Sequence, residues 1–448
     1  MRFVVSMTAL VLSISWAVPA SSEPLTPAEA LREALARNPQ VTAARAQVEA
    51  ARGRVDQGVS RWLPSLSATA AYSRQTGNFA PRPGLSLSNL GAAGSAVQYR
   101  STNDSYDYFS LGLSLQQTIW DFGRTLGVSR QASAGLEAAS EDLETVRDRI
   151  WIDVVEAFHR VLAAEEMLGM TTRNEEQAQR HLELAVARVE AGMRPPIDRV
   201  RGQADLEGAR AARVAAENGV LLAREALGAV LGRPEWIERS LAAPDIGAQE
   251  VVFDADQVLA DALEKRPERA ALRARIRAQE AVVLSQQGLY WPILSANAFF
   301  TDTGLDLREM VWNWGAGLSL TVPILSAPQT AGQVREARAL LVALRAQLDS
   351  LEWQVRLEVR QALARVRDAS RRLVFLEAQA ALGREALDMA EGRYEAGTGT
   401  LLELLDARNA LANAEAQRIQ GRLDLAVARA LLVRVSGRVP MDGMGEAE

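Results

Sequence analysis

The 448-residue sequence contains no cysteine and only two histidines, His159 and His181. The absence of cysteine excludes disulfides, thiol nucleophiles, thiolate metal ligands and the lipid-attachment cysteine of a bacterial lipoprotein. Neither histidine belongs to a catalytic or metal-binding motif, so both are expected to be surface or packing residues. Because phosphate-loop, zinc and triad signatures are also missing, we expect no enzymatic activity, cofactor or metal.

Aromatic residues make up only 5% of the chain, and neither sign of charge dominates. The 50 basic and 56 acidic residues give a net charge of −6, which argues against nucleic acid as a partner. What is abundant instead is Ala, Leu, Arg and Glu, a composition typical of long helices and coiled coils.

Long apolar runs are absent after the N-terminus. Arg2 precedes an apolar run over residues 3–18, and small residues around Ala20 offer cleavage sites, a pattern typical of a secretory signal. A single membrane anchor is the alternative, but a span needs about 20 apolar residues. We therefore expect a signal peptide at residues 1–22 and a mature chain at 23–448 that leaves the cytoplasm.

The mature chain reads as two tandem repeats, at about 25–232 and 254–437. Asn38-Pro39 corresponds to Arg266-Pro267 at an offset of 228, and from Leu111 onward the offset is 205. The first half therefore carries a 23-residue insertion between Pro64 and Leu111. This segment is rich in Gly, Pro and Ser, and is expected to be an exposed loop.

Four short segments alternate apolar and polar residues and are expected to be strands: 64–75, 106–118, 293–302 and 312–323. Aromatic residues gather at both ends of these segments, as in an outer-membrane barrel whose apolar face meets lipid. A soluble four-stranded sheet is the alternative. Because the smallest membrane barrels have about eight strands, a barrel here requires several chains.

Proline is absent from residues 124–191 and 329–396, each stretch 68 residues long. As helices these stretches span about 100 Å at ~1.5 Å per residue. Apolar residues alternate at steps of three and four, which predicts left-handed supercoiling. Residues 39–63 and 197–231 predict shorter helices, so each half supplies one continuous and one broken helical column. Residues 25–38, 232–256 and the C-terminus are expected to form a belt of mixed structure midway along.

Two similar turns join the long helices to the shorter ones. They are RVEAG at residues 188–192 and RYEAG at residues 393–397. Gly192 and Gly397 suit the left-handed conformation that ends a helix, and Thr400 with Glu403 has capping-box spacing. Hairpin tips are therefore predicted near 190–198 and 395–403, about 100 Å from the strands.

These hairpins, the YEAGTGTLLELLDA segment at 394–407 and the two Gly-Leu-Ser-Leu strands resemble the TolC-like outer membrane efflux proteins over residues 25–437. The resemblance implies a mainly α fold with a small β part. Long coiled-coil helices of a homotrimer would form an α-barrel, and four strands per chain would contribute to a 12-stranded transmembrane β-barrel. It implies location in the outer membrane of a Gram-negative bacterium, in contact with its lipid and extending into the periplasm.

The function implied by the resemblance is a passive exit duct of a tripartite efflux or type I secretion system. The duct would open at its periplasmic tip on docking a periplasmic adaptor (membrane fusion) protein and an inner-membrane pump. A periplasmic coiled-coil scaffold or adaptor without channel activity is the alternative; it would share the signal peptide and heptads but would not need four strands.

The resemblance also implies roles for residues at the tip. Asp198 and Tyr394 match positions whose polar links hold the family's closed gate. The family's prototype has a basic residue where this chain has Gly399, and Arg194 occupies the equivalent place in the first hairpin. The gate is therefore either rewired through Arg194 or weaker.

Further tip residues are implied in the pore and on the outside. Glu403 and Asp406 match acidic rings, which favour cations and can take up divalent metal; from spacing alone they are equally explained as solvated helix residues. Gly192, Gly397 and Thr398 lie in the hairpins that would dock the adaptor.

Overall fold

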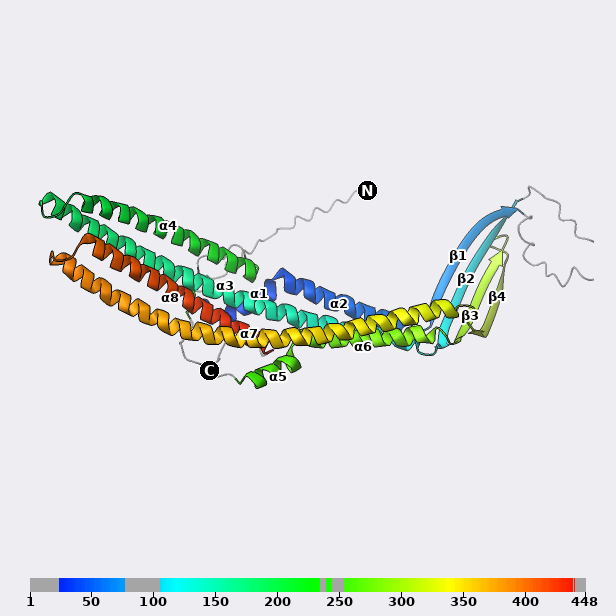
Figure 1. Cartoon of the computed structure of the whole chain (residues 1–448). Helices are drawn as coiled ribbons and strands as arrows, with labels where there is room; N and C mark the ends of the chain where they lie inside the picture. Colours follow the sequence, from blue (N-terminus) through cyan, green and yellow to red (C-terminus); the bar gives the residue numbers. More distant parts are fainter. Residues whose placement is uncertain (1–23, 77–104, 234–238, 244–253, 438, 440–448) are drawn as a thin grey trace, which may run out of the picture.

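The computed structural model describes residues 24–76, 105–233, 239–243, 254–437 and 439. The expected signal peptide at 1–22 and most of the expected insertion loop lie outside these ranges. The molecule is elongated, with a four-stranded sheet at one end and two helical hairpins at the other (Figure 1).

The two halves contain the same order of elements. The first half contains α1 (Pro27–Arg37), α2 (Pro39–Ser60), β1 (Ser65–Thr76), β2 (Ser105–Trp120), α3 (Arg124–Glu190) and α4 (Ile197–Leu231). The second half contains α5 (Ala255–Lys265), α6 (Pro267–Gly288), β3 (Ile293–Gly304), β4 (Met310–Thr321), α7 (Ala327–Glu395) and α8 (Leu401–Val435). The expected strand at 312–323 thus begins and ends two residues earlier, and the expected helix at 39–63 ends at Ser60.

The proline-free stretches form single continuous helices, α3 with 67 residues and α7 with 69. The shorter helices α2 and α4 follow one another along α3, and α6 and α8 follow one another along α7 (Figure 1). Each half therefore supplies one continuous and one broken column. A proline at the first position of α2 and of α6 starts each of these helices, because proline needs no backbone donor there.

The middle of the molecule is held by two matching apolar clusters. In the first, α1 packs on α3 and α4 around Val154 and Leu227. In the second, α5 packs on α7 and α8 around Val359 and Leu432, which are the same positions displaced by 205. A short parallel bridge between Leu25 and Leu241 joins the N-terminal segment to the connection that follows α4.

The sheet is antiparallel in the order β1-β2-β3-β4. Leu113 of β2 pairs with Ala68 of β1 on one side and with Phe300 of β3 on the other, and Phe300 pairs with Trp314 of β4. Since paired residues point to the same face, the apolar positions of all four strands lie together.

The opposite face of the sheet carries mainly small and polar residues, with Phe299 paired to Ser114 and Gly315 among them. The hydroxyl groups of Ser67 in β1 and Ser114 in β2 form a hydrogen bond with their oxygens 2.6 Å apart. The hydroxyl groups of Ser295 in β3 and Ser319 in β4 form a similar bond at 3.0 Å. No layer of the described chain covers the apolar face: Trp314 is 70% exposed and Leu318 is 71% exposed. An uncovered apolar face of this kind suits contact with lipid.

Within the described ranges, no helix combines the length and apolar content needed to cross a bilayer.

Candidate functional site

The candidate site is the end of the molecule where both helical hairpins turn (Figure 1). Gly192 has φ 72° and Gly397 has φ 78°, so both adopt the left-handed conformation predicted for them. In the first turn, the Met193 N–H donates to the Arg188 carbonyl oxygen at 2.9 Å. This bond satisfies a carbonyl at the end of α3 and fixes the direction of the chain toward α4.

The second turn is closed more tightly than the first. The N–H groups of Thr398 and Gly399 both donate to the Arg393 carbonyl oxygen, at 3.0 and 2.8 Å. Thr400 then caps α8, because its hydroxyl oxygen accepts from the Glu403 N–H at 3.2 Å. The capping-box spacing predicts this bond. The Glu403 carboxylate itself lies 3.6 Å from the Arg393 guanidinium.

Two arginines of the first hairpin hold the second hairpin by its backbone. Arg188 donates to the carbonyl oxygens of Tyr394 (2.6 Å) and Glu395 (2.9 Å). Arg194 donates to the carbonyl oxygen of Gly399 at 2.6 Å. We call these contacts the tip clamp. Hydrogen bonds from a charged donor to carbonyls at a helix end are among the stronger contacts at a protein surface.

Tyr394 lies at the centre of the tip clamp. The Arg188 guanidinium lies 4.8 Å and the Arg194 guanidinium 5.4 Å from the centroid of its ring, so both make cation–π contacts. The side chain is 1% exposed and packs with Leu401 and Leu404 of α8. Burial raises the pKa of Tyr394, and the negative charge of Asp198 raises it further.

The structure thus brings the three predicted gate residues, Asp198, Tyr394 and Arg194, to one place. Asp198 is 6% exposed in the first turn of α4. In this single chain the contacts of the tip clamp run from arginine side chains to backbone carbonyls. Arg188 was not among the predicted gate residues, although it is the first residue of the RVEAG motif.

Behind the tip clamp, two further polar pairs join the hairpins. Arg408 of α8 bonds Asp205 of α4; the Arg408 side chain is 6% exposed and the Asp205 side chain is 12% exposed. His181 of α3 lies 3.3 Å from Glu391 of α7. Burial lowers the pKa of His181 although Glu391 acts in the opposite direction, so this histidine is a packed residue, as expected. None of these contacts was predicted.

The predicted pore residues Glu403 and Asp406 share one exposed face of α8. The opposite face of this helix carries Leu401, Leu404 and Leu411, which are buried against α7. The two carboxylates are therefore free to face an aqueous space. Among the described residues of one chain, no group of three or more His, Cys, Asp or Glu side chains is placed to hold a metal ion.

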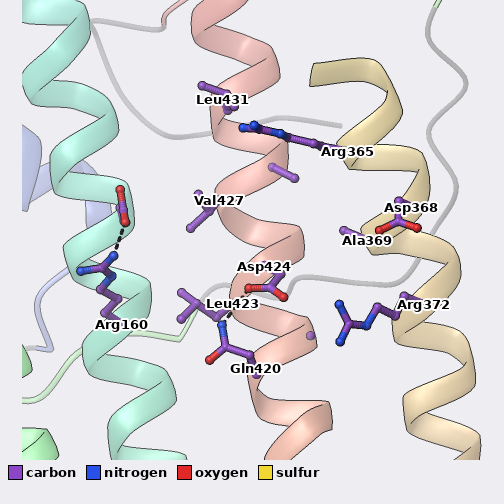
Figure 2. A pocket seen from close by; sticks show the side chains of 13 residues that line it. Arg160, Arg365, Asp368, Ala369, Arg372, Gln420, Leu423, Asp424, Val427 and Leu431 are labelled. Carbon is purple, nitrogen blue, oxygen red and sulfur yellow. Dashed lines mark hydrogen bonds and ion pairs between the residues drawn. The ribbon is translucent and has the colours of Figure 1, made fainter. Parts of the chain in front are cut away.

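A groove of about 580 Å³ lies over α8 between α3 and α7 (Figure 2). Arg365, Asp368 and Arg372 of α7 line one side, and Arg160 of α3 lines the other. Gln420 donates to Asp424 on the intervening α8. The lining contains charged and apolar residues but no Ser, Thr, Cys, His or Tyr, so it lacks a nucleophile paired with a base.

The family model for outer membrane efflux proteins matches residues 30–233 and 258–438. The chain belongs to the outer membrane efflux protein family. The two matched ranges correspond to the two halves of the fold, so the family assignment covers both hairpins and all four strands.

Curated members of the outer membrane efflux protein family resemble this chain along most of its length. The pyoverdine export outer membrane protein OpmQ of Pseudomonas aeruginosa is 25% identical over 407 residues, covering 88% of this chain and 81% of OpmQ. The outer membrane protein TolC of Escherichia coli is 25% identical over 409 residues, covering 86% and 76%. Protein CyaE of Bordetella pertussis is 26% identical over 377 residues, covering 81% and 78%.

Solved outer-membrane channels share the fold. The channel OprN superposes with a TM-score of 0.78 at 22% identity, covering 92% of this chain and 89% of OprN. CusC superposes with a TM-score of 0.78 at 16% identity, covering 91% of each chain. The predicted mainly α fold with a small β part is confirmed as that of these channels.

The family, the fold and the uncovered apolar sheet together identify an outer-membrane exit duct. Proteins of this family are transporters rather than enzymes. The four strands, which a periplasmic scaffold or adaptor has no need of, distinguish the duct from that alternative.

Proposed function

We propose that three copies of this chain form the duct, and that it belongs to a tripartite efflux or secretion system. The edge strands β1 and β4 each have one neighbour in the described sheet, so each leaves a row of backbone hydrogen-bonding groups available. Four strands are too few for a membrane barrel, whose smallest form has about eight. Pairing β4 of one copy with β1 of the next in a ring of three copies gives a closed barrel of twelve strands.

The proposed gate is the tip clamp, repeated in each copy. With both hairpins of a chain held together, the α-barrel narrows at its tip; with them parted, it widens. Arg194 takes the role of the basic residue that the second hairpin lacks at Gly399. A Cβ at position 399 would lie 3.0 Å from the Tyr394 backbone nitrogen, so the tight second turn favours glycine there. This geometry supports the gate rewired through Arg194 over the weaker gate.

The proposed opening signal is docking of a periplasmic adaptor protein coupled to an inner-membrane pump. Gly192, Gly397 and Thr398 lie at the extreme turns of the two hairpins, where such a protein would reach first. Contacts that part the hairpins need only displace the charge-assisted bonds from Arg188 and Arg194. The wide-open state would then admit cargo handed over by the pump.

The single observation that carries this proposal is the apolar, uncovered sheet at one end of two continuous helices of 67 and 69 residues. The test is reconstitution of the purified protein in planar lipid bilayers. We expect discrete steps of conductance with a preference for cations, and extraction from membranes by detergent but not by alkali. Release by alkali as a protein that never conducts would contradict the duct.

A further inference from the structure

A second layer of polar contacts lies one heptad behind the tip clamp. His181 precedes Arg188 by seven residues in α3, and Asp205 follows Asp198 by seven residues in α4. Seven residues of a helix rise about 10 Å, so this layer repeats the positions of the clamp on the side away from the turns. We call the four residues that meet in this layer the four-helix cluster: His181, Asp205, Glu391 and Arg408.

The four-helix cluster takes one side chain from each helix of the two hairpins. The Nε2 of His181 in α3 lies 3.3 Å from the Glu391 carboxylate of α7, and Arg408 of α8 bonds Asp205 of α4. Each pair therefore joins the first hairpin to the second. Parting of the hairpins, which opens the proposed gate, must break both pairs.

The surroundings of the His181 ring suit its neutral form. The side chain is 13% exposed, and Nδ1 is buried without a hydrogen-bond partner among the described residues. A neutral imidazole has one N–H, and with the proton on Nε2 that group donates to Glu391. An imidazolium has an N–H on both nitrogens, so a proton on Nδ1 lacks an acceptor in this arrangement.

The charges of the cluster act on the ring in both directions. Burial is the main cause that lowers the pKa of His181, and the positive charge of Arg408 lowers it further, whereas Glu391 and Asp205 raise it. Parting the hairpins hydrates the ring and returns its pKa toward the ordinary value of about 6.5. The parted state then binds a proton more readily than the closed state, so the ratio of parted to closed copies rises as the pH falls below about 6.5.

The other histidine of the chain does not connect the hairpins. His159 lies on the same helix, and its Nδ1 contacts the Val155 carbonyl oxygen of that helix at 2.8 Å. Burial lowers the pKa of His159 as well. The two histidines therefore share a helix and a direction of pKa shift, but only His181 bonds a side chain of the second hairpin among the described contacts.

We propose that His181 is a proton-sensitive gating residue: a proton on its ring weakens the contact between the two hairpins and favours the open duct. The inference rests on the proposed gate at the tip and names the residue that links this gate to the pH around it. Between pH 7.5 and pH 5.5, carboxylates of ordinary pKa stay ionised. Asp148, whose pKa is about 7, also titrates in this window and therefore needs its own control.

The test is single-channel recording of the full-length protein in planar bilayers at pH 7.5 and pH 5.5. For the wild type we expect the ratio of open to closed time to rise about threefold or more on acidification. His181→Gln keeps a side chain that can donate to Glu391 but cannot titrate, so its ratio should be the same at both pH values. His159→Gln and Asp148→Asn are the matched controls and should keep the wild-type response.

Glu391 provides a second arm that separates titration from packing. Because Glu391 raises the pKa of His181 in the closed tip, it limits the difference between the closed and parted states. Glu391→Gln should therefore enlarge the change in the open-to-closed ratio, about twofold over that of the wild type. Glu385→Gln, which removes an exposed acid of the same helix, should leave the change as it is. A purely structural role of the cluster would shift the ratio equally at both pH values.

The latch role of His181 and the duct itself fail in distinguishable ways. A wild-type ratio that does not change with pH, or a response that His181→Gln keeps, overturns the gating role and leaves the duct intact. If His181→Gln does not assemble, Glu391→Gln decides, because an unchanged or smaller response overturns the proposal. A purified protein that conducts at neither pH overturns the duct.

Discussion

Arg194 in the turn after α3 donates a hydrogen bond of 2.6 Å to the carbonyl oxygen of Gly399 in the turn after α7. The two residues are 205 positions apart, the offset of the internal repeat, so they occupy equivalent places in the two hairpins. A side chain in one copy of the repeat therefore contacts the backbone of the other copy at the matching position. The glycine leaves room for this approach.

Arg194→Ala is expected to favour the open state of the tip. The change removes a charge-assisted hydrogen bond, worth roughly 1.5–3 kcal/mol, and one of the two cation–π contacts to Tyr394. An effect of this size shifts the balance of closed and open states about tenfold or more. Single-channel recording should show larger or longer openings.

The control for this variant is Arg199→Ala, which removes the same charge from an exposed position in the first turns of α4. If both variants change the conductance equally, the effect belongs to the charge of the tip and the clamp plays no part in gating.

Glu403→Ala Asp406→Ala is expected to weaken cation preference. In the proposed trimer these carboxylates would form two rings, and rings of negative charge concentrate cations at a pore. Arg393 lies 3.6 Å from Glu403 and offsets part of the charge of that carboxylate. The two residues should therefore contribute unequally to cation preference, with the larger share from Asp406. The measurement is the reversal potential in a salt gradient.

Asp256→Ala Glu264→Ala is the matched control, because it removes two exposed carboxylates from α5, far from the tip (Figure 1). An unchanged reversal potential in the tip variant would show that Glu403 and Asp406 are ordinary solvated helix residues.

The elements of this fold could be predicted from sequence because their signals are local. Proline-free heptads define α3 and α7, alternation defines the strands, and Gly192 and Gly397 mark where the long helices end. Small errors arose at element ends. β4 begins at Met310 because it pairs with Gly304 across the turn, and that register was not visible in its own alternation.

The contacts of the tip could be predicted only in part. Asp198, Tyr394 and Arg194 came from resemblance, whereas the bonds of Arg188 to Tyr394 and of Arg408 to Asp205 span more than 200 positions. The chain contains 50 basic residues, nearly all arginine and many on helix faces. No local pattern indicates which of them meets a carbonyl or an acid on another hairpin.

Arg408→Leu is expected to destabilise the hairpin pair strongly. The change leaves Asp205, whose side chain is only 12% exposed, without its partner, and losing one partner of a largely buried pair costs about 3–5 kcal/mol. The exposed pair of Arg210 and Glu207 provides the control, since Arg210→Ala should cost about 1 kcal/mol or less. Thermal unfolding followed by circular dichroism should separate the two, and adding Asp205→Leu should recover part of the loss. Equal melting temperatures for the two single variants would show that burial adds nothing to the Arg408 pair.

A buried carboxyl in the middle of the molecule gives a pH dependence. Asp148 of α3 is 7% exposed, and its pKa is raised from 3.8 to about 7. Burial is the main cause, and the negative charges of Glu268 and Glu144 add to it. Arg434 and Arg266 act in the opposite direction. Groups from α3, from α6 and its N-cap, and from α8 therefore set the protonation of this one side chain.

Asp148→Asn is expected to stabilise the protein above neutral pH and to have little effect near pH 4. The folded state holds the Asp148 proton up to about pH 7, whereas the unfolded chain releases it near 3.8. The folded state therefore binds more protons in that window, and the contribution of Asp148 to stability falls as pH rises from about 4 to about 7. Asparagine keeps the shape and removes the titration, so the gain at pH 8 should be on the order of 1 kcal/mol after discounting for partial access of water.

Melting temperatures of both proteins from pH 4 to pH 8 provide the measurement, with the exposed Asp388→Asn of α7 as control. A constant difference between wild type and Asp148→Asn across that range would mean that Asp148 stays charged in the folded protein, held by Arg434 and Arg266.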